Sequence, residues 1–190
     1  MEDAAISLIR RHSSIADDFG AVLAAAKRGE DWALTALYRH LHPPLLNYLQ
    51  GRCGPEAEDV ASEVWIEVAR ALDRFEGDES GFRSFVFTIA WRRQVDHGRR
   101  ATRRRADALE GLVLPAAGDT EADVLALLAT NEAVARIVAL LTPQQAEVVL
   151  LRVIADLPVD EVAAIVGKKP GAVRAIQHRA LTRLAQRLDP

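Results

Sequence analysis

The sequence is poor in several residue types that mark common protein classes. Its single cysteine, Cys53, cannot form an internal disulfide, and no neighbouring thiols accompany it to hold a metal. No run of roughly 18 apolar residues occurs, and the N-terminus carries no long uncharged apolar stretch. These absences predict a cytoplasmic protein without membrane insertion and without a disulfide framework.

Aromatic residues are also scarce, at 5% of the 190 residues, although apolar residues reach 49%. Ala, Leu and Val dominate the apolar set, and Arg far outnumbers Lys. This mixture favours helices over sheets. The length is sufficient for one large domain or two small ones, each with its own core.

Motifs of catalysis are lacking as well. The five histidines are scattered, no His–Glu metal spacing occurs, and no glycine-rich phosphate loop is present. His42, directly before Pro43, is interpreted as a structural residue. We therefore expect no catalytic residue, no metal ligand and no cofactor, and the protein is predicted not to be an enzyme.

Charge is present but unevenly placed, and the net charge of −3 hides this. Seven arginines and one acid, Asp96, lie between Arg92 and Arg105. Residues 106–133 contain six acids and no Lys or Arg, and from Lys168 onward six basic residues face only Asp189. Two basic patches separated by an acidic stretch predict two nucleic-acid contacts joined by a solvated linker.

Apolar periodicity and turn residues predict the helices. They are expected over residues 17–26, 31–49, 56–72, 82–100, 120–141, 143–154, 159–166 and 171–188. Asp31 is the expected N-cap of the second helix, which Pro43-Pro44 should kink or interrupt. Thr142, with Pro143 and Gln145, predicts a capping box. The third helix has an expected buried stripe of Val60, Val64, Ile66, Val68, Ala71 and Leu72.

These elements predict an all-α protein of two small helical domains joined by a flexible linker. After an N-terminal extension (1–18), the first domain covers residues 19–105 and contains a polar, glycine-bearing loop at 75–81. Residues 106–119 form the linker, which we expect to be mobile and protease-sensitive. Residues 120–190 form the second domain.

The C-terminal pattern is the sharpest signal. A short helix (159–166), a turn with Gly167 and a longer basic helix predict a helix-turn-helix, whose second helix enters the DNA major groove. The apolar stripe of the last helix is expected at Val173, Ile176, Ala180 and Leu184. The outward residues are Lys168, Lys169, Arg174, Ala175, His178, Arg179 and Arg183.

These residues resemble a known family. Residues 141–152 (LTPQQAEVVLLR), 157–166 (LPVDEVAAIV) and 171–181 (GAVRAIQHRAL) are similar to the C-terminal domain of bacterial RNA polymerase sigma factors of the sigma-70 family, extracytoplasmic-function (ECF) group. Residues 57–68 (AEDVASEVWIEV), 75–90 (FEGDESGFRSFVFTIA) and 96–100 (DHGRR) resemble the first domain of the same family. The two domains follow in the family's order and spacing, over roughly 19–105 and 132–188.

The resemblance implies a function in promoter recognition for transcription initiation. The partners would be core RNA polymerase, through its β′ clamp helices and β subunit, promoter DNA and an anti-sigma factor. Core polymerase would bind Asp59, Ser62, Glu63, Ile66 and Glu67. The −10 element would contact Ala71, Phe75, Trp91, Arg92, Arg93, Asp96, Arg99 and Arg100. The −35 element would contact Lys168, Lys169, Gly171, Arg174, Ala175, His178 and Arg179.

Four positions depart from the family pattern: Ser62, Arg92, Ala172 and Ala175 replace a frequent Gln, Asn, Thr and Ser. The preferred promoter bases are therefore not carried over. One alternative is a stand-alone helix-turn-helix regulator, whose first half would sense a ligand or dimerise. The Arg-rich helix of the first domain argues against a stand-alone regulator. A third interpretation is an enzyme, against which the lack of catalytic motifs argues.

Overall fold

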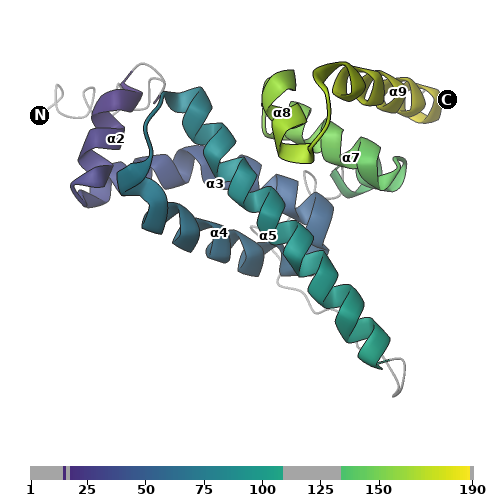
Figure 1. The fold of residues 1–190 in the computed structure, drawn as a ribbon, viewed down its shortest axis with the longest axis horizontal. Helices are drawn as coiled ribbons and strands as arrows, with labels where there is room; N and C mark the ends of the chain where they lie inside the picture. Colours follow the sequence, from purple (N-terminus) through teal and green to yellow (C-terminus); the bar gives the residue numbers. More distant parts are fainter. Residues whose placement is uncertain (1–14, 16–17, 109–133, 189–190) are drawn as a thin grey trace, which may run out of the picture.

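The computed structural model describes residue 15, residues 18–108 and residues 134–188, and within these ranges every regular element is a helix (Figure 1). The all-α fold with two domains is confirmed. Most of the N-terminal extension, residues 109–119 of the expected linker and residues 120–133 of the next helix lie outside the described residues.

The first domain consists of four α-helices. They are α2 (Phe19–Lys27), α3 (Asp31–Cys53), α4 (Ala57–Ala71) and α5 (Glu79–Ala108), with short 3₁₀ turns at Gly54–Glu56 and Leu72–Arg74. The core helix α3 packs against α2, α4 and α5 (Figure 1). Its contacts place α4 and α5 side by side, and these two helices carry the predicted polymerase and −10 surfaces.

Helix α3 differs from the sequence prediction because it runs through Pro43 and Pro44 without interruption. Each proline removes one backbone hydrogen bond and crowds the preceding turn. The flanking Leu41, Leu45 and Leu49 are at most 1% exposed, so burial on both sides of the prolines holds the helix together. The expected N-cap is also wrong by one residue, since Glu30 precedes a helix that begins at Asp31.

Helix α5 begins at Glu79, three residues earlier than predicted, and continues to Ala108. The side chain of Asp78 accepts a hydrogen bond from the backbone N–H of Gly81 (2.8 Å), and its carbonyl accepts one from Phe82 (2.9 Å). Asp78 therefore caps the helix, and capping converts the second half of the predicted loop into helical structure.

The second domain contains a helical segment at 134–139, α7 (Pro143–Val149), a π-helical turn (Leu150–Ile154), α8 (Val159–Val166) and α9 (Pro170–Leu188). The predicted capping box is confirmed. Thr142 accepts a hydrogen bond from the Gln145 N–H, and the Gln145 side chain accepts one from the Thr142 N–H.

The helix-turn-helix is also confirmed. Gly167 ends α8 in the left-handed conformation (φ 64°), where a residue without Cβ is not strained. The predicted stripe of α9, formed by Val173, Ile176, Ala180 and Leu184, is buried. The outer face of α9 is consequently turned to solvent.

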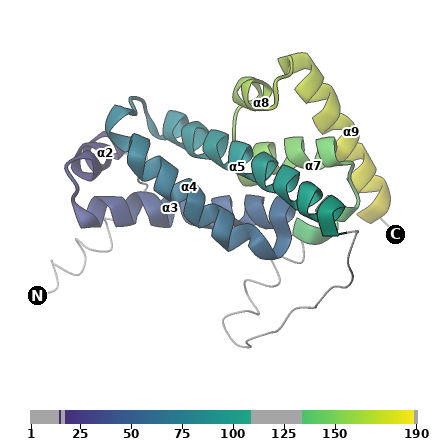
Figure 2. The ribbon, with the colours of Figure 1, turned by 60° about the horizontal axis from the view of Figure 1, so that its bottom comes forward.

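The two domains share an apolar core in this structure. One continuous cluster of buried residues includes Leu49 and Phe87 of the first domain and Leu150 and Val162 of the second. Figure 2 shows α7 and α8 against the α5 side of the first domain. The two domains therefore lie in direct contact.

The capping box leads to a first prediction. Thr142→Ala removes the hydroxyl that accepts the Gln145 N–H, and we expect it to lower the free energy of unfolding by about 1 kcal/mol. Thr182→Ala is the control, because the Thr182 hydroxyl only donates to the His178 carbonyl within α9 and Ala favours helix. Urea unfolding followed by helical circular dichroism measures both, and equal losses would contradict the role of the cap.

Candidate nucleic-acid interface

The outer face of α9 carries the most exposed basic group of the second domain. Lys168, Lys169, Gly171, Arg174, Ala175, His178 and Arg179 are all exposed, as predicted. Within the described residues, none of the charged side chains among them forms an ion pair. Their charges are therefore available to phosphate or base acceptors.

Arg152 holds α9 in place, and sequence reasoning missed it. Its Nε donates to the Gln177 side chain of α9 (3.3 Å), and its Nη1 donates to the backbone carbonyl of Leu157 in the turn before α8. One guanidinium thus links the π-helical turn to α9 and to the turn before α8. The available signal was an isolated arginine within the otherwise apolar segment 148–154.

Helix α4 exposes the face predicted to bind polymerase. Asp59, Ser62, Glu63 and Ile66 are exposed, while Val64 on the opposite side is fully buried. The placement of Ile66 in the buried stripe was wrong, because its side chain is 52% exposed. An exposed Ile among acids gives this face an apolar centre with a charged rim.

An aromatic cluster lies beside this face, between α3 and α4. Trp65 Nε1 donates to His42 Nδ1 (3.2 Å), and the rings of Tyr38 and His42 stack with centroids 4.4 Å apart. Burial lowers the pKa of His42, so at neutral pH its ring nitrogen is free to accept that hydrogen bond. His42 therefore takes part in the contact between α3 and α4, although the helix break expected after it is absent.

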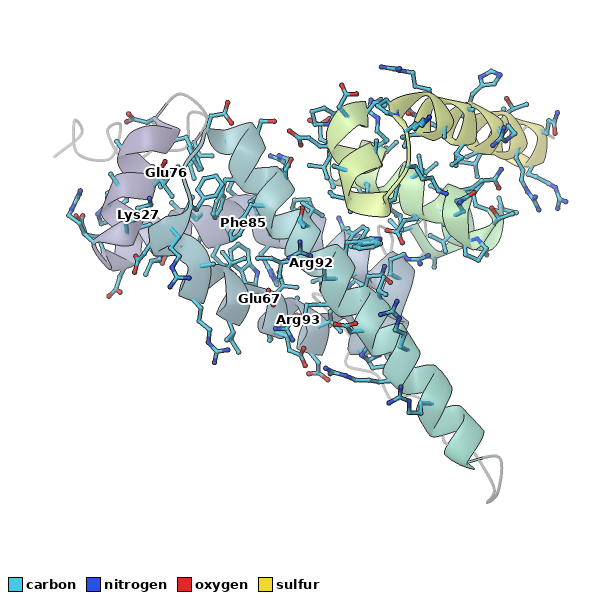
Figure 3. All side chains as sticks on the ribbon, in the orientation of Figure 1. Lys27, Glu67, Glu76, Phe85, Arg92 and Arg93 are labelled. Atoms are coloured by element: carbon cyan, nitrogen blue, oxygen red, sulfur yellow. The ribbon has the colours of Figure 1, made fainter. Side chains whose placement is uncertain are left out.

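Arg93 connects the two predicted surfaces. Its guanidinium bonds Glu67 (2.6 Å and 2.7 Å) and reaches Glu63 (3.2 Å), so it links α5 to α4. Figure 3 shows Arg93 and Glu67 next to each other between the two helices. Two residues predicted to bind polymerase are thus paired with one predicted to bind DNA, which no single-sequence pattern indicates.

The loop that precedes α5 is held by its own aromatic residue. The Phe75 ring is half-buried and packs on Phe82 and Phe85, with centroids 5.2 Å and 5.3 Å away. A Cβ on Gly77 would approach the Phe75 ring to 3.0 Å, so glycine permits the ring to fold under the loop. Contact of Phe75 with the −10 element remains a prediction.

A polar triad, also missed by sequence reasoning, fixes the start of α5. The Glu79 carboxylate lies 2.8 Å from His40 Nε2 and 2.7 Å from the Arg83 guanidinium. Burial by itself would raise the pKa of Glu79, but the hydrogen bonds from His40 and Arg83 hold it below its usual range. The loop end is therefore tied to α3 by a charged carboxylate.

The remaining predicted −10 residues lie at the end of α4 and along α5. Ala71 and Trp91 are half-buried, whereas Arg92, Asp96, Arg99 and Arg100 are exposed. Arg99 and Asp96 form a weak surface pair at 3.7 Å. Arg92, Arg99 and Arg100 thus form the accessible basic strip of α5.

Among the residues that the structure describes, no group of His, Cys, Asp or Glu side chains is placed to hold a metal ion. No helix in the described ranges has both the length and the apolar character of a membrane span.

Comparisons with known proteins agree with this geometry. The sigma-70 region 2 family matches residues 37–104, and the sigma-70 region 4 family matches residues 131–184. The ECF RNA polymerase sigma factor SigD of Mycobacterium tuberculosis is 34% identical over 171 residues, covering 86% of this chain and 81% of that protein. The ECF sigma factor ShbA of Streptomyces griseus is 35% identical over 176 residues, covering 87% and 92%.

Solved structures share the fold. CnrH, in complex with the cytosolic domain of CnrY, superposes with a TM-score of 0.60 at 23% identity, over 89% of this chain and 96% of that one. The Bartonella quintana sigma factor RpoE, in complex with the anti-sigma factor NepR, gives 0.62 at 19% identity, over 82% and 98%. Together with the sequence relatives and the two matched regions, this shows that the chain belongs to the ECF sigma factors, DNA-binding proteins of transcription initiation.

Proposed function

We propose that this chain binds core RNA polymerase and directs it to promoters by reading a −35 and a −10 element. The observation that carries the proposal is the exposed, unpaired basic face of α9 on a helix-turn-helix. Lys168 and Lys169, in the turn before α9, suit phosphates, and Arg174 suits bidentate contact with guanine in the major groove. The loop 75–81 and the exposed arginines of α5 would read the −10 element.

The polymerase surface is assigned to α4. Asp59, Ser62, Glu63 and Ile66 form an exposed face with an apolar centre and acidic rim, which suits a basic helical partner such as the β′ clamp helices. Glu67 is engaged by Arg93 and contributes at the edge of this face. The β subunit would be contacted by the second domain.

An anti-sigma factor is the proposed regulator. Two of the solved structures that share the fold are those of CnrH in complex with the cytosolic domain of CnrY and of RpoE in complex with the anti-sigma factor NepR. A comparable partner would occupy the α4 face or hold the domains so that promoter contacts are blocked.

The deciding experiment is in vitro transcription with core polymerase and a promoter library. Transcription that depends on this chain and on defined −35 and −10 sequences supports the proposal. Specific binding of the chain alone to an operator, without any effect on core polymerase, would instead establish a stand-alone regulator.

A prediction concerns polymerase docking. Reversal of Asp59 and Glu63 together to Lys should abolish binding to core polymerase while the helical circular dichroism is retained, because the rim, now basic, would repel a basic partner. Reversal of Asp73 and Glu76, two exposed acids outside α4, is the charge-matched control. Unchanged affinity of the Asp59/Glu63 variant in a titration with core polymerase would disprove the assignment.

A further prediction separates the adjacent arginines of α5. Each phosphate contact contributes about 0.9 to the slope of log affinity against log salt. Arg92→Ala should flatten this slope for the promoter complex, whereas Arg93→Ala should leave it unchanged because Glu63 and Glu67 hold that guanidinium. If Arg93→Ala flattened the slope equally, the result would show that Arg93 of the wild type leaves Glu63 and Glu67 and contacts a phosphate when DNA binds.

The last prediction concerns α9. Arg174→Ala and Arg179→Ala should each lower the binding free energy for the preferred −35 site by about 1–3 kcal/mol. Lys168→Ala should weaken binding to all sequences alike. Affinities for specific and random duplexes test this, and equal losses on both for all three variants would reduce α9 to a nonspecific basic surface.

A further inference from the structure

The loop before α5, which is proposed to read the −10 element, is attached to α5 at both of its ends. At its start, the Phe75 ring packs on Phe82 and Phe85, with centroids 5.2 Å and 5.3 Å away. At its end, Asp78 caps α5 by accepting hydrogen bonds from the backbone N–H groups of Gly81 and Phe82. These contacts fold the loop onto its own helix, but they do not fix it relative to the other helices of the domain.

One hydrogen bond ties the end of the loop to a different helix. His40 lies on α3, 39 positions before Glu79, and its Nε2 is 2.8 Å from the Glu79 carboxylate. The same carboxylate accepts hydrogen bonds from Arg83 Nε (3.2 Å) and Nη2 (2.7 Å). Although burial alone would raise the pKa of Glu79, the hydrogen bonds from His40 and Arg83 keep it below its usual range. An ionised carboxylate can only accept, so His40 Nε2 carries the proton of this hydrogen bond.

The bond from His40 adds a directional constraint to the start of α5. The buried Phe82 ring also holds this end of the helix, 5.6 Å from the Phe19 ring of α2. Apolar attraction is non-directional, whereas a hydrogen bond weakens steeply as its angle departs from linear. The contact between His40 and Glu79 therefore fixes the rotation of the α5 start about its axis, and with it the orientation of the attached loop.

The residues that hold the loop differ from those that DNA can reach. The side chain of His40 is 30% exposed, and its Nε2 is engaged by the Glu79 carboxylate. Glu76, Gly77 and Asp78, in the middle of the loop, are exposed. His40 consequently acts on the exposed segment through Glu79 and not by contact with DNA.

We propose that His40 is a positioning residue for −10 recognition, which holds the loop 75–81 in its reading orientation through the hydrogen bond with Glu79. The inference rests on the proposed promoter recognition and assigns a function to a residue of α3, outside the predicted −10 surface. Loss of the bond leaves the exposed arginines of α5 in place. Contacts with phosphates therefore persist, while discrimination between bases falls.

The conformational test uses the full free chain and requires neither polymerase nor DNA. His40→Ala removes the donor and should accelerate amide hydrogen exchange at Phe82 about tenfold, the effect of one hydrogen bond to a charged group. His40→Gln should restore the wild-type rate, because its side-chain amide can donate to Glu79 from a similar position. His42→Ala is the matched control and should leave the rate unchanged, since this histidine contacts Trp65 of α4.

Two further variants show whether the effect passes through Glu79. In a Glu79→Ala background, His40→Ala should have no additional effect on the exchange rate, because the acceptor is already absent. If circular dichroism shows that the alanine variant of His40 is unfolded, His40→Asn replaces it, since its shorter amide falls short of the Nε2 position. A wild-type exchange rate in a folded variant without the bond overturns the proposal, and so does additivity of the two alanine substitutions.

The functional test uses the chain assembled with core polymerase. A single-stranded −10 oligonucleotide of the sequence selected by in vitro transcription is compared with one of scrambled sequence. His40→Ala should lower the affinity for the selected oligonucleotide about tenfold. The affinities for the scrambled oligonucleotide and for the −35 duplex should stay within about twofold, because the phosphate contacts persist. His40→Gln should restore the discrimination.

The outcomes separate this inference from the proposed function. If the wild-type holoenzyme does not discriminate between the two oligonucleotides, the proposed −10 recognition fails and the inference fails with it. If the wild type discriminates and His40→Ala does so equally well, −10 recognition stands and His40 does not position the loop. An equal loss of affinity for both oligonucleotides also overturns the inference, because it would show general damage to the surface.

Discussion

Burial of the leucine face of α3 is the constraint on which the first domain depends. Leu41, Leu45 and Leu49 are fully buried on a helix that packs against α2, α4 and α5, and their burial maintains a helix that contains two consecutive prolines. Because α4 and α5 both pack on α3, their remaining faces are the ones that partners can reach. The outward position of Asp59 on α4 and of Arg92 on α5 follows from this packing.

Electrostatic pairing then decides which charges on these faces are available. Glu79 is held by His40 and Arg83, Glu67 is held by Arg93, and Glu147 is held within the domain contact. Each carboxylate links residues of different helices. It therefore fixes the relative position of those helices as well as the position of the charged side chains. Within the part of the chain that the structure describes, the arginines of α9 form no such ion pair, and this distinguishes them from the arginines that link helices of the fold.

Much of the fold could be predicted from local pattern. The capping box at Thr142, the glycine turn at Gly167 and the apolar stripe of α9 depend on residues only a few positions apart, and all were confirmed. The interruption at Pro43 was wrong because tertiary burial outweighed the local cost of proline. The start of α5 was missed because Asp78 was assigned to the loop 75–81, whereas its side chain caps the helix.

The sequence by itself determined most of the described helices, most of their buried positions and the family, since periodicity, caps and ordered motifs are local properties of the chain. Only the tertiary structure decided which predicted site residues are free. Arg93 and Glu67 are 26 positions apart, and Tyr48 and Glu147 are 99 apart, so their pairing depends on how whole helices pack. Burial makes these contacts specific, because a charge that is removed from water without a partner costs free energy.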